Sequence, residues 1–432
     1  MKIIHTSDWH LGHALYNYSR EEEQADMLRQ MTRIVEKEKP DAFVISGDVY
    51  DTMQPSTSVQ TMLADALVEI HRANPKMLTV CIAGNHDSGS RHTIYRTPWK
   101  ALNVEMVGNI SRDSRLEDYI FKVEGKGYIV AVPFAADRFM PEDVYVRLLE
   151  MVGSISRDSL LDDYIFKLEG KGYIVAVPFA ADRFMPEDVF IRLQDMVAEM
   201  NKEEQLPVFL SAHLAVARCD YRGHDMSTDE NIGGLGCQEL SVFGEGYDYI
   251  GLGHIHKYQK LDNEGRIYYC GTPIAMSFDE VYRGNRHCVM LVECDRHGAI
   301  PQVTPLEINN PRPLVNIPQE GFAEWEEVKR EFMNYPDDIS SYVRLNVEVE
   351  NYLKSGANDE ARMIASTKAC RFCLINAKRK ESIQKEKERR VFTTSEFKQL
   401  DTTDVARMWI ESKGVTFDDE MRQIIEEVKR DI

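Results

Sequence analysis

The chain has 432 residues and a formal net charge of −19, and this length is enough for two or three domains. Its apolar content of 43% is ordinary for a globular protein, and no apolar run approaches the ~20 residues that span a bilayer. The negative charge disfavours a protein that coats nucleic acid by itself, because phosphate binding normally needs a basic face. A nucleic-acid enzyme is not excluded, because bound divalent ions or a partner subunit can supply positive charge.

Two features predict a reduced, cytoplasmic protein. A strand pattern begins at the N-terminus and brings Asp8 and His10 close to the start of the chain, which argues against a cleaved signal peptide. The eight cysteines are scattered, and several lie in apolar runs. Cys370 and Cys373 form a lone pair with no second pair to match, so we favour helical packing over zinc binding or redox work.

The N-terminal part alternates between predicted strands and helices. Apolar runs at residues 2–7, 42–46 and 78–83 indicate buried strands, and residues 21–38 and 58–73 carry apolar stripes at helical spacing. This rhythm predicts an α/β layer structure. Right-handed crossovers would place these three strand ends on one edge of the sheet.

Further strands are predicted at residues 207–212 and 249–252, and histidines follow both. Residues 267–270 and 287–293 are predicted to be antiparallel strands that close the sheet. A polar, glycine-rich stretch at residues 220–236 is long enough to form a loop that faces the substrate.

Residues 106–150 are repeated almost unchanged as residues 151–195, with a period of 45 residues. Two copies are too few for a solenoid, which needs about three or more, so the repeat indicates a local duplication or an artefact of sequence assembly. Each copy predicts two strands and a helix, and neither contains a histidine. We expect one copy to complete the core sheet and the other to be a peripheral insertion.

Residues 309–313 are typical of a linker, and we place the first domain boundary there. Residues 343–349 alternate as expected for a half-exposed strand. The basic stretch 368–390 indicates either a solvated helix face or linker interleaved with glutamates, or a surface that contacts a phosphate backbone. Two amphipathic patterns within residues 394–432 predict a module that docks on another protein. The predicted domains are residues 1–310, 311–390 and 391–432.

Side chains with oxygen or nitrogen donors follow five predicted strand ends, which suggests one shared site. They are Asp8, His10, Asp48, Asn85, His213, His254 and His256. Two divalent ions ~3.5–4 Å apart can bind the attacking and leaving oxygens of a phosphoryl displacement and lower the pKa of a water. The mixed donor set suits Mn²⁺, Fe²⁺ or Zn²⁺ better than Ca²⁺ or Mg²⁺. The sequence therefore predicts a two-metal site.

Asp48 follows a Ser-Gly turn and is the candidate for the carboxylate that both ions share. The other ligands divide into Asp8, His10 and His256 for one ion, and Asn85, His213 and His254 for the other. Residues two apart on a strand face the same way, so one strand end can offer two ligands. A single histidine at a strand end is more often a core or loop residue, and only the combination of five clusters favours a metal site.

Two neighbouring residues complete the predicted site, and two nearby histidines are assigned no role in it. His86 adjoins a predicted ligand and should face the substrate, where an imidazole can protonate the leaving oxygen or stabilise charge on the phosphate. Asp87 should orient a neighbour by hydrogen bonding. We expect His5 to lie in the core and His13 to be an exposed neighbour of the site.

Five motifs resemble those of the calcineurin-like metallophosphoesterases. They are Asp8-Trp9-His10-Leu11-Gly12, Gly47-Asp48-Val49-Tyr50-Asp51, Gly84-Asn85-His86-Asp87-Ser88, His213 and Gly253-His254-Ile255-His256. Within that superfamily the chain resembles the bacterial SbcD-type nucleases over nearly its whole length. The resemblance implies an α/β fold, with a two-layered β-sheet sandwich flanked by helices and a smaller α+β capping domain.

The resemblance also implies a function. The seven predicted ligands match the family's dimanganese ligands, and His86 matches its catalytic histidine. The implied activity is a Mn²⁺-dependent 3′–5′ exonuclease on double-stranded DNA and an endonuclease on single strands and hairpins, in DNA repair, recombination and replication. Archaeal and eukaryotic relatives have a second histidine where this chain has Asp51, so the resemblance assigns no role to that residue.

The implied partners are DNA, which the capping domain would touch, and the coiled-coil ATPase SbcC, on which residues 394–432 would dock. The implied assembly is a homodimer within a heterotetramer, without a membrane. Two other functions fit the residues. The chain could be a phosphoesterase that acts on a small molecule or a protein, or a non-catalytic architectural subunit with a structural metal site.

Overall fold

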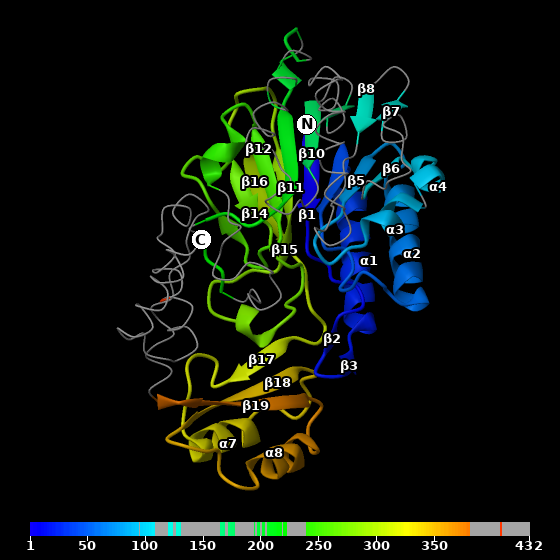
Figure 1. Ribbon diagram of the computed structural model, residues 1–432. Helices are drawn as coiled ribbons and strands as arrows, with labels where there is room; N and C mark the ends of the chain where they lie inside the picture. Colours follow the sequence, from blue (N-terminus) through cyan, green and yellow to red (C-terminus); the bar gives the residue numbers. More distant parts are fainter. Residues whose placement is uncertain are drawn as a thin grey trace, which may run out of the picture.

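Figure 1 shows the computed structural model of the chain. The structure describes residues 1–94, 96–108, 120–123, 127–130, 165–168, 172–177, 194, 197–198, 201–203, 205–217, 219–222, 239–380 and 407. Most of the predicted loop at residues 220–236 lies outside the described residues, as does the predicted docking module at residues 394–432 apart from Arg407.

The larger domain is built from two six-stranded sheets (Figure 1). The first sheet has the order β16 (Gln302–Glu307), β15 (Cys288–Glu293), β1 (Lys2–Thr6), β4 (Ala42–Ser46), β5 (Leu78–Ile82) and β6 (Val104–Val107). The second has the order β13 (Gln259–Lys260), β14 (Ile267–Tyr269), β12 (Tyr249–Gly253), β11 (Val208–His213), β10 (Gly172–Val177) and β9 (Ile165–Leu168).

Apolar side chains from both sheets form one core between the layers. Val44 and Met290 of the first sheet share this core with Phe209 and Tyr249 of the second. The two helices predicted near the N-terminus, α1 (Glu21–Glu38) and α2 (Thr57–Ala73), share a second core with the other face of the first sheet (Figure 1). The predicted two-layered α/β sandwich with flanking helices is therefore confirmed. None of the described helices is long and apolar enough to cross a membrane.

The strand directions place the loops that carry the predicted ligands. β1, β4 and β5 run parallel in the first sheet, and β11 and β12 run parallel in the second. The carboxyl ends of β1, β4 and β5 therefore meet at one edge, as predicted. The prediction that two later strands are antiparallel holds for β15, which pairs with β1, and holds only in part for β14, which runs antiparallel to β13 but parallel to β12. A short apolar run does not specify its direction or its sheet.

The two copies of the 45-residue repeat occupy different places. In the second copy, β9 and β10 pair with each other, and β10 runs parallel beside β11 in the second sheet. The same segments of the first copy, β7 (Ile120–Val123) and β8 (Gly127–Val130), form a separate two-stranded sheet. One copy thus completes the core sheet, as expected, and it is the second.

Residues 314–380 form a smaller domain, called the cap here (Figure 1). Its three parallel strands are β17 (Leu314–Ile317), β18 (Tyr342–Val349) and β19 (Arg371–Arg379), and its helices are α7 (Trp325–Met333) and α8 (Ala357–Ala365). β18 was predicted to be half exposed, but residues 342–347 are all buried. The prediction was wrong because both faces are covered: Val343 and Leu345 pack with the cap helices, while Tyr342 packs with side chains of the larger domain.

Within the described part of the basic stretch, residues 368–380, Arg371–Arg379 form the strand β19 and not a helix. Arg371 begins β19, donates a hydrogen bond of 2.9 Å to the Tyr342 hydroxyl, and lies over the ring of Tyr18. The Lys368 side chain is 3% exposed and pairs with Asp337. Both cations are thus used inside the protein, which favours a structural role for them over phosphate contact. Helical packing of the cysteine pair was also wrong, because Cys373 lies within β19.

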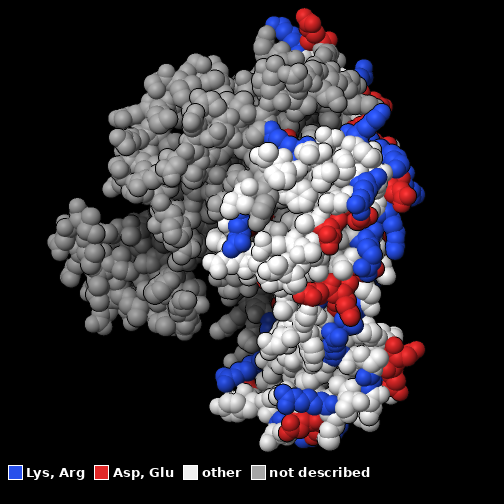
Figure 2. All heavy atoms as spheres, turned by 90° about the vertical axis from the view of Figure 1, so that its right-hand side faces the viewer, with Lys and Arg blue, Asp and Glu red and all other residues white. Residues whose placement is uncertain are grey.

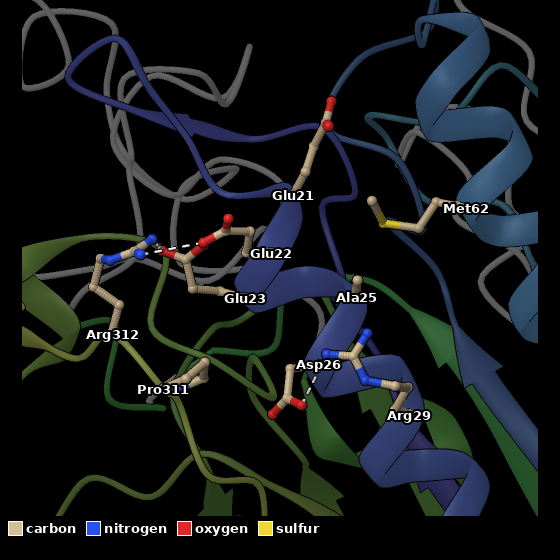
Figure 3. A pocket seen from close by; sticks show the side chains of 9 residues that line it. All are labelled: Glu21, Glu22, Glu23, Ala25, Asp26, Arg29, Met62, Pro311 and Arg312. Carbon is tan, nitrogen blue, oxygen red and sulfur yellow. Dashed lines mark hydrogen bonds and ion pairs between the residues drawn. The ribbon is translucent and has the colours of Figure 1, made fainter. Parts of the chain in front are cut away.

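The surface has no continuous basic face in the view of Figure 2, where acidic and basic side chains of the described residues are interspersed. A groove of about 610 Å³ lies between the first turns of α1 and linker residues Pro311 and Arg312 (Figure 3). Three consecutive glutamates, residues 21–23, and Asp26 line it. Arg312 pairs with Glu22 and Glu23 there. An acidic lining repels phosphate, so we place no nucleic acid in this groove.

Candidate metal centre

The predicted ligands lie in the loops at the carboxyl ends of five strands. Asp8 and His10 follow β1, Asp48 follows β4, Asn85 follows β5, His213 ends β11, and His254 and His256 follow β12. Donor atoms of these residues and of His86 fall into three overlapping groups, in each of which all atoms lie within 4.8 Å of one another. The groups are Asp8 with His10 and His256, Asp48 with His213 and His254, and His10 with Asp48 and His86.

Asn85 joins the second group through its side-chain oxygen. Asn85 Oδ1 lies 3.0 Å from His213 Nε2 and 3.1 Å from His254 Nδ1. The third group shares His10 with the first group and Asp48 with the second, and so links them. Asp48 Oδ2 is 3.4 Å from His213 Nε2 and 3.7 Å from His10 Nε2. The structure thus brings all the sequence-predicted ligands together, in the two predicted sets, with Asp48 between them.

Four of these residues have backbone conformations that ordinary side chains rarely adopt. The φ angles are 53° at Asp8, 43° at His10, 50° at Asp48 and 98° at His254. Each such residue costs about 1–3 kcal/mol, and such residues cluster at functional sites. Asp8 and His10 share one group, as predicted. Strand alternation is not the cause, because both residues lie beyond β1 in left-handed conformations.

Two glycines allow the loops to approach each other. A Cβ atom at Gly84 would lie 2.1 Å from Asp48 Oδ1. One at Gly253 would lie 1.9 Å from the carbonyl oxygen of Ser46 and 2.7 Å from His213 Nδ1. Glycine is required at these positions because a side chain would occupy the space of the donor atoms.

His213 is oriented by the backbone. Its Nδ1 donates a hydrogen bond of 2.7 Å to the carbonyl of Ser46, so that Nε2 faces Asp48 and Asn85. Burial alone would lower the pKa of His213, but the Asp48 carboxylate raises that pKa to about 9. Burial likewise opposes ionisation of Asp48, yet His213 and His10 hold its pKa well below the usual value.

His10 has a buried nitrogen that no group of the described residues satisfies. Its Nδ1 lies 3.4 Å from Asp51 Oδ1, while its Nε2 is buried and has no hydrogen-bond partner within that part of the chain. Burial alone would lower the pKa of His10, but Asp51, Asp48 and Asp8 raise it to about 9. A buried, unpartnered imidazole nitrogen beside carboxylates fits a divalent cation. The residues present therefore suit the metal ions that the sequence predicts.

Glu280 was not identified by sequence reasoning. It is fully buried at the end of the short 3-10 helix η5 (Phe278–Glu280). Its Oε1 accepts from His256 Nδ1 at 3.1 Å, and its Oε2 accepts from Thr272 Oγ1 at 2.7 Å and from the Met276 N–H at 3.0 Å. Although burial opposes ionisation, the hydrogen bond and charge of His256, the charge of His287 and the Met276 N–H lower the pKa of Glu280 to about 2. A carboxylate that orients a metal-binding histidine is a recurring feature of metal sites, but a single sequence offers no signal for this pairing.

His86 belongs to the group that links the two ligand sets. Its ring centre is 4.9 Å from that of His10, and its backbone N–H donates to Asp48 Oδ1 at 2.9 Å. His86 Nδ1 donates to the carbonyl of Asp51 at 3.0 Å, which leaves Nε2 available to hold or give a proton.

Asp87 acts on the backbone, as predicted. It is 1% exposed and accepts hydrogen bonds from the N–H groups of Gly84, Val49 and Tyr50 at 2.9, 3.1 and 2.9 Å. These bonds join the loop after β4 to the loop after β5, and hold Asp48 near His86.

The structure confirms the predicted position of His5 but not that of His13. His5 is 1% exposed and makes a hydrogen bond of 3.0 Å with the Tyr249 hydroxyl, so its predicted core position is confirmed. His13 was predicted to be exposed but is half-buried. Burial lowers the pKa of His13 to about 4, and the charges of Asp51 and Arg20 act on it. His13 itself is therefore partly packed against the domain, although its neighbours Gly12 and Ala14 are exposed.

Comparison with known proteins identifies the family. Residues 1–258 match the pattern of the calcineurin-like phosphoesterases. The chain belongs to that family. It is 29% identical over 339 residues to the SbcD subunit of the SbcCD nuclease of Rhodobacter capsulatus, covering 76% of this chain and 74% of that one. It is 26% identical over 314 residues to the SbcD subunit of the SbcCD nuclease of Escherichia coli K12, covering 73% and 70%.

A shorter match is 41% identical over 91 residues to the SbcD subunit of the Bacillus subtilis SbcCD nuclease, covering 21% of this chain and 23% of that one. The calcineurin-like phosphoesterase pattern covers all five strand ends that carry the predicted ligands. Together with the donor groups of the site, it makes this chain a phosphoesterase that depends on divalent metal ions.

Proposed function

We propose that the chain is a DNA nuclease of the SbcD type, which hydrolyses phosphodiester bonds with two Mn²⁺ ions. The observation that carries this proposal is the linking group of His10, Asp48 and His86 between two sets of metal-binding side chains. The names of the relatives, which are nuclease subunits, support a nucleic acid as the substrate, and the resemblance to the SbcD-type nucleases implies DNA. The mixed oxygen and nitrogen donors support Mn²⁺ over Mg²⁺ or Ca²⁺.

One ion would be held by Asp8, His10 and His256, the other by Asn85, His213 and His254, and Asp48 would be shared. When bound, the ions polarise the phosphate oxygens and lower the pKa of the attacking water. His86 gives a proton to the leaving oxygen through Nε2, because the carbonyl of Asp51 occupies Nδ1.

We further propose the partners that the names of the relatives suggest. The chain would act as a homodimer with an SbcC-type ATPase, docking through residues 394–432, and would cut double-stranded ends as a 3′–5′ exonuclease and hairpins as an endonuclease. The cap would touch DNA through residues other than Lys368 and Arg371, since these two are engaged inside the cap and at its junction with the larger domain.

The experiment compares purified wild-type protein, His86→Ala and the control His71→Ala, a histidine in the last turn of α2. Each is assayed with Mn²⁺ on a DNA hairpin and on bis-p-nitrophenyl phosphate, and bound metal is measured by elemental analysis. Loss of a general acid should slow cleavage by about 10²–10⁴-fold, with metal content unchanged. His71→Ala should behave as wild type.

Hydrolysis of the small ester alone would contradict the nuclease proposal and leave a phosphoesterase with another substrate. Undiminished cleavage by His86→Ala would contradict the role of that histidine. If wild-type protein binds metal but hydrolyses neither substrate, with or without the ATPase, the result would favour an architectural subunit.

A further inference from the structure

We propose that the cap positions the metal ligand His256, through Asn316 and Arg344. This inference rests on the proposed metal site and adds residues of the second domain to its support. Asn316 lies on β17 and Arg344 on β18, where the two residues are register partners. Both side chains point toward the larger domain and are 6% and 9% exposed.

The element that the cap holds is the short helix η5, which carries Glu280. Glu280 bonds to His256 Nδ1 and to two further donors of the larger domain. The direction of its carboxylate therefore depends on where η5 lies, and the direction of the His256 ring depends on that carboxylate.

Asn316 holds the backbone on both sides of Glu280. Its Nδ2 donates to the carbonyl of Phe278 at 2.9 Å and to the carbonyl of Val281 at 3.1 Å. An amide nitrogen has two hydrogens, so both are used on this one turn. The position of the turn is thereby tied to the position of β17.

Arg344 fixes Asn316 and the outer side of η5 together. Its Nε donates to Asn316 Oδ1 at 2.9 Å, which sets the orientation of the amide. Its Nη1 pairs with Asp279 Oδ1 at 2.6 Å, and its guanidinium lies 5.3 Å from the centre of the Phe278 ring. A continuous series of contacts thus runs from β18 through Asn316, η5 and Glu280 to His256.

The cap has a second attachment that does not involve η5 hydrogen bonds. The Tyr342 hydroxyl donates to Glu23 Oε1 at 2.8 Å. Arg312 pairs with the same glutamate at 2.9 Å (Figure 3). Because Glu23 is on α1, these bonds hold the cap without bonding to η5. The Tyr342 ring packs in the same apolar cluster as Phe278, and Tyr342→Phe keeps that ring. The two attachments can therefore be perturbed separately, and Tyr342→Phe is the matched control.

The test measures Mn²⁺ binding by calorimetry to wild type, Asn316→Ala, Asp279→Ala and Tyr342→Phe, all as full-length chains. His256→Ala identifies which binding event depends on that ligand. In Asn316→Ala and Asp279→Ala this event should weaken by about 2- to 30-fold, the range for residues that act through a coupled network. The other event should be unchanged, and Tyr342→Phe should leave both unchanged.

Asp279 has a 69% exposed side chain, so Asp279→Ala should fold even if Asn316→Ala does not, and it then decides the outcome. Binding of both ions within about twofold of wild type in every folded variant would overturn the inference, since even weak coupling gives about that change. Equal weakening of both events, or the same weakening in Tyr342→Phe, would show a general effect of cap docking and would also overturn it. Absence of Mn²⁺ binding to wild type would instead refute the proposed function.

Discussion

Raising the pH from about 7 to about 8 should strengthen Mn²⁺ binding by about 10- to 100-fold, because metal binding must displace protons from the ligands. His10 and His213 each have a pKa of about 9 in the metal-free protein. Both imidazoles are therefore protonated at neutral pH, and each must lose its proton before its nitrogen can bind a cation.

The range of 10- to 100-fold arises because His10 and His213 interact with the same carboxylate, that of Asp48. Asp48 Oδ2 lies 3.4 Å from His213 Nε2 and 3.7 Å from His10 Nε2. When one imidazole is protonated, its charge offsets that of Asp48, so the other imidazole binds its proton less tightly. One displaced proton gives about a tenfold change per pH unit, and two give about a hundredfold. At neutral pH each displaced proton costs about 3 kcal/mol, from about two pKa units at 1.36 kcal/mol each.

The assay is calorimetry of Mn²⁺ binding in buffers that differ in ionisation enthalpy, which counts the protons released. About one to two protons should be released near pH 7, and Asp48→Asn should reduce that number together with the affinity. Release of no protons, with an affinity independent of pH, would refute the assignment of His10 and His213 as protonated partners of Asp48.

The same ion pairs predict how the stability of the metal-free protein depends on pH. The folded pKa values of His10 and His213 are raised above the ordinary value of 6.5. Their contribution to stability is therefore fully present below pH 6.5 and is lost as the pH rises through about 9. Thermal unfolding with a chelator present should show this loss, and saturating metal should remove it.

Three further changes test the packing around the site. Gly84→Ala places a Cβ atom 2.1 Å from Asp48 Oδ1, so metal binding should be lost and unfolding should cost at least about 1–3 kcal/mol less; wild-type metal content would contradict this. Tyr342→Phe removes the hydroxyl that bonds Glu23 and should lower the free energy of unfolding by about 1–2 kcal/mol, measured with urea. Deletion of residues 106–150 leaves a second copy that already supplies β9 and β10, so folding and activity should survive, and loss of either would show that the first copy is needed.

The local pattern of the sequence determined most of the larger domain. Residues 21–38 have apolar residues at helical spacing, and the helix predicted from them has the same bounds as α1. The parallel strands β1, β4 and β5 are apolar runs that must be buried. Polar residues directly after such runs must lie at the sheet edge. For that reason Asp48 and Asn85, which follow the neighbouring strands β4 and β5, could be placed at one edge from the sequence alone.

Features that depend on distant contacts could not be predicted. The direction of β14 depends on its neighbour β12. The burial of β18 depends on a larger domain that covers one of its faces. The second copy of the repeat, rather than the first, joins the core sheet. Two nearly identical sequences have the same local preferences, so only their place along the chain can separate them.

The sequence by itself determined which side chains can bind metal, because the chemistry of carboxylate, amide and imidazole donors belongs to the residues and their positions after the strands. Only the tertiary structure decided what orients those donors. Glu280 reaches His256 from a turn between β14 and β15, and Asn316 reaches that turn from the cap. Such contacts join segments that are far apart along the chain, and no periodicity or spacing records them. The physical reason is that hydrogen-bond geometry is set by where elements pack, while local sequence sets only what those elements are.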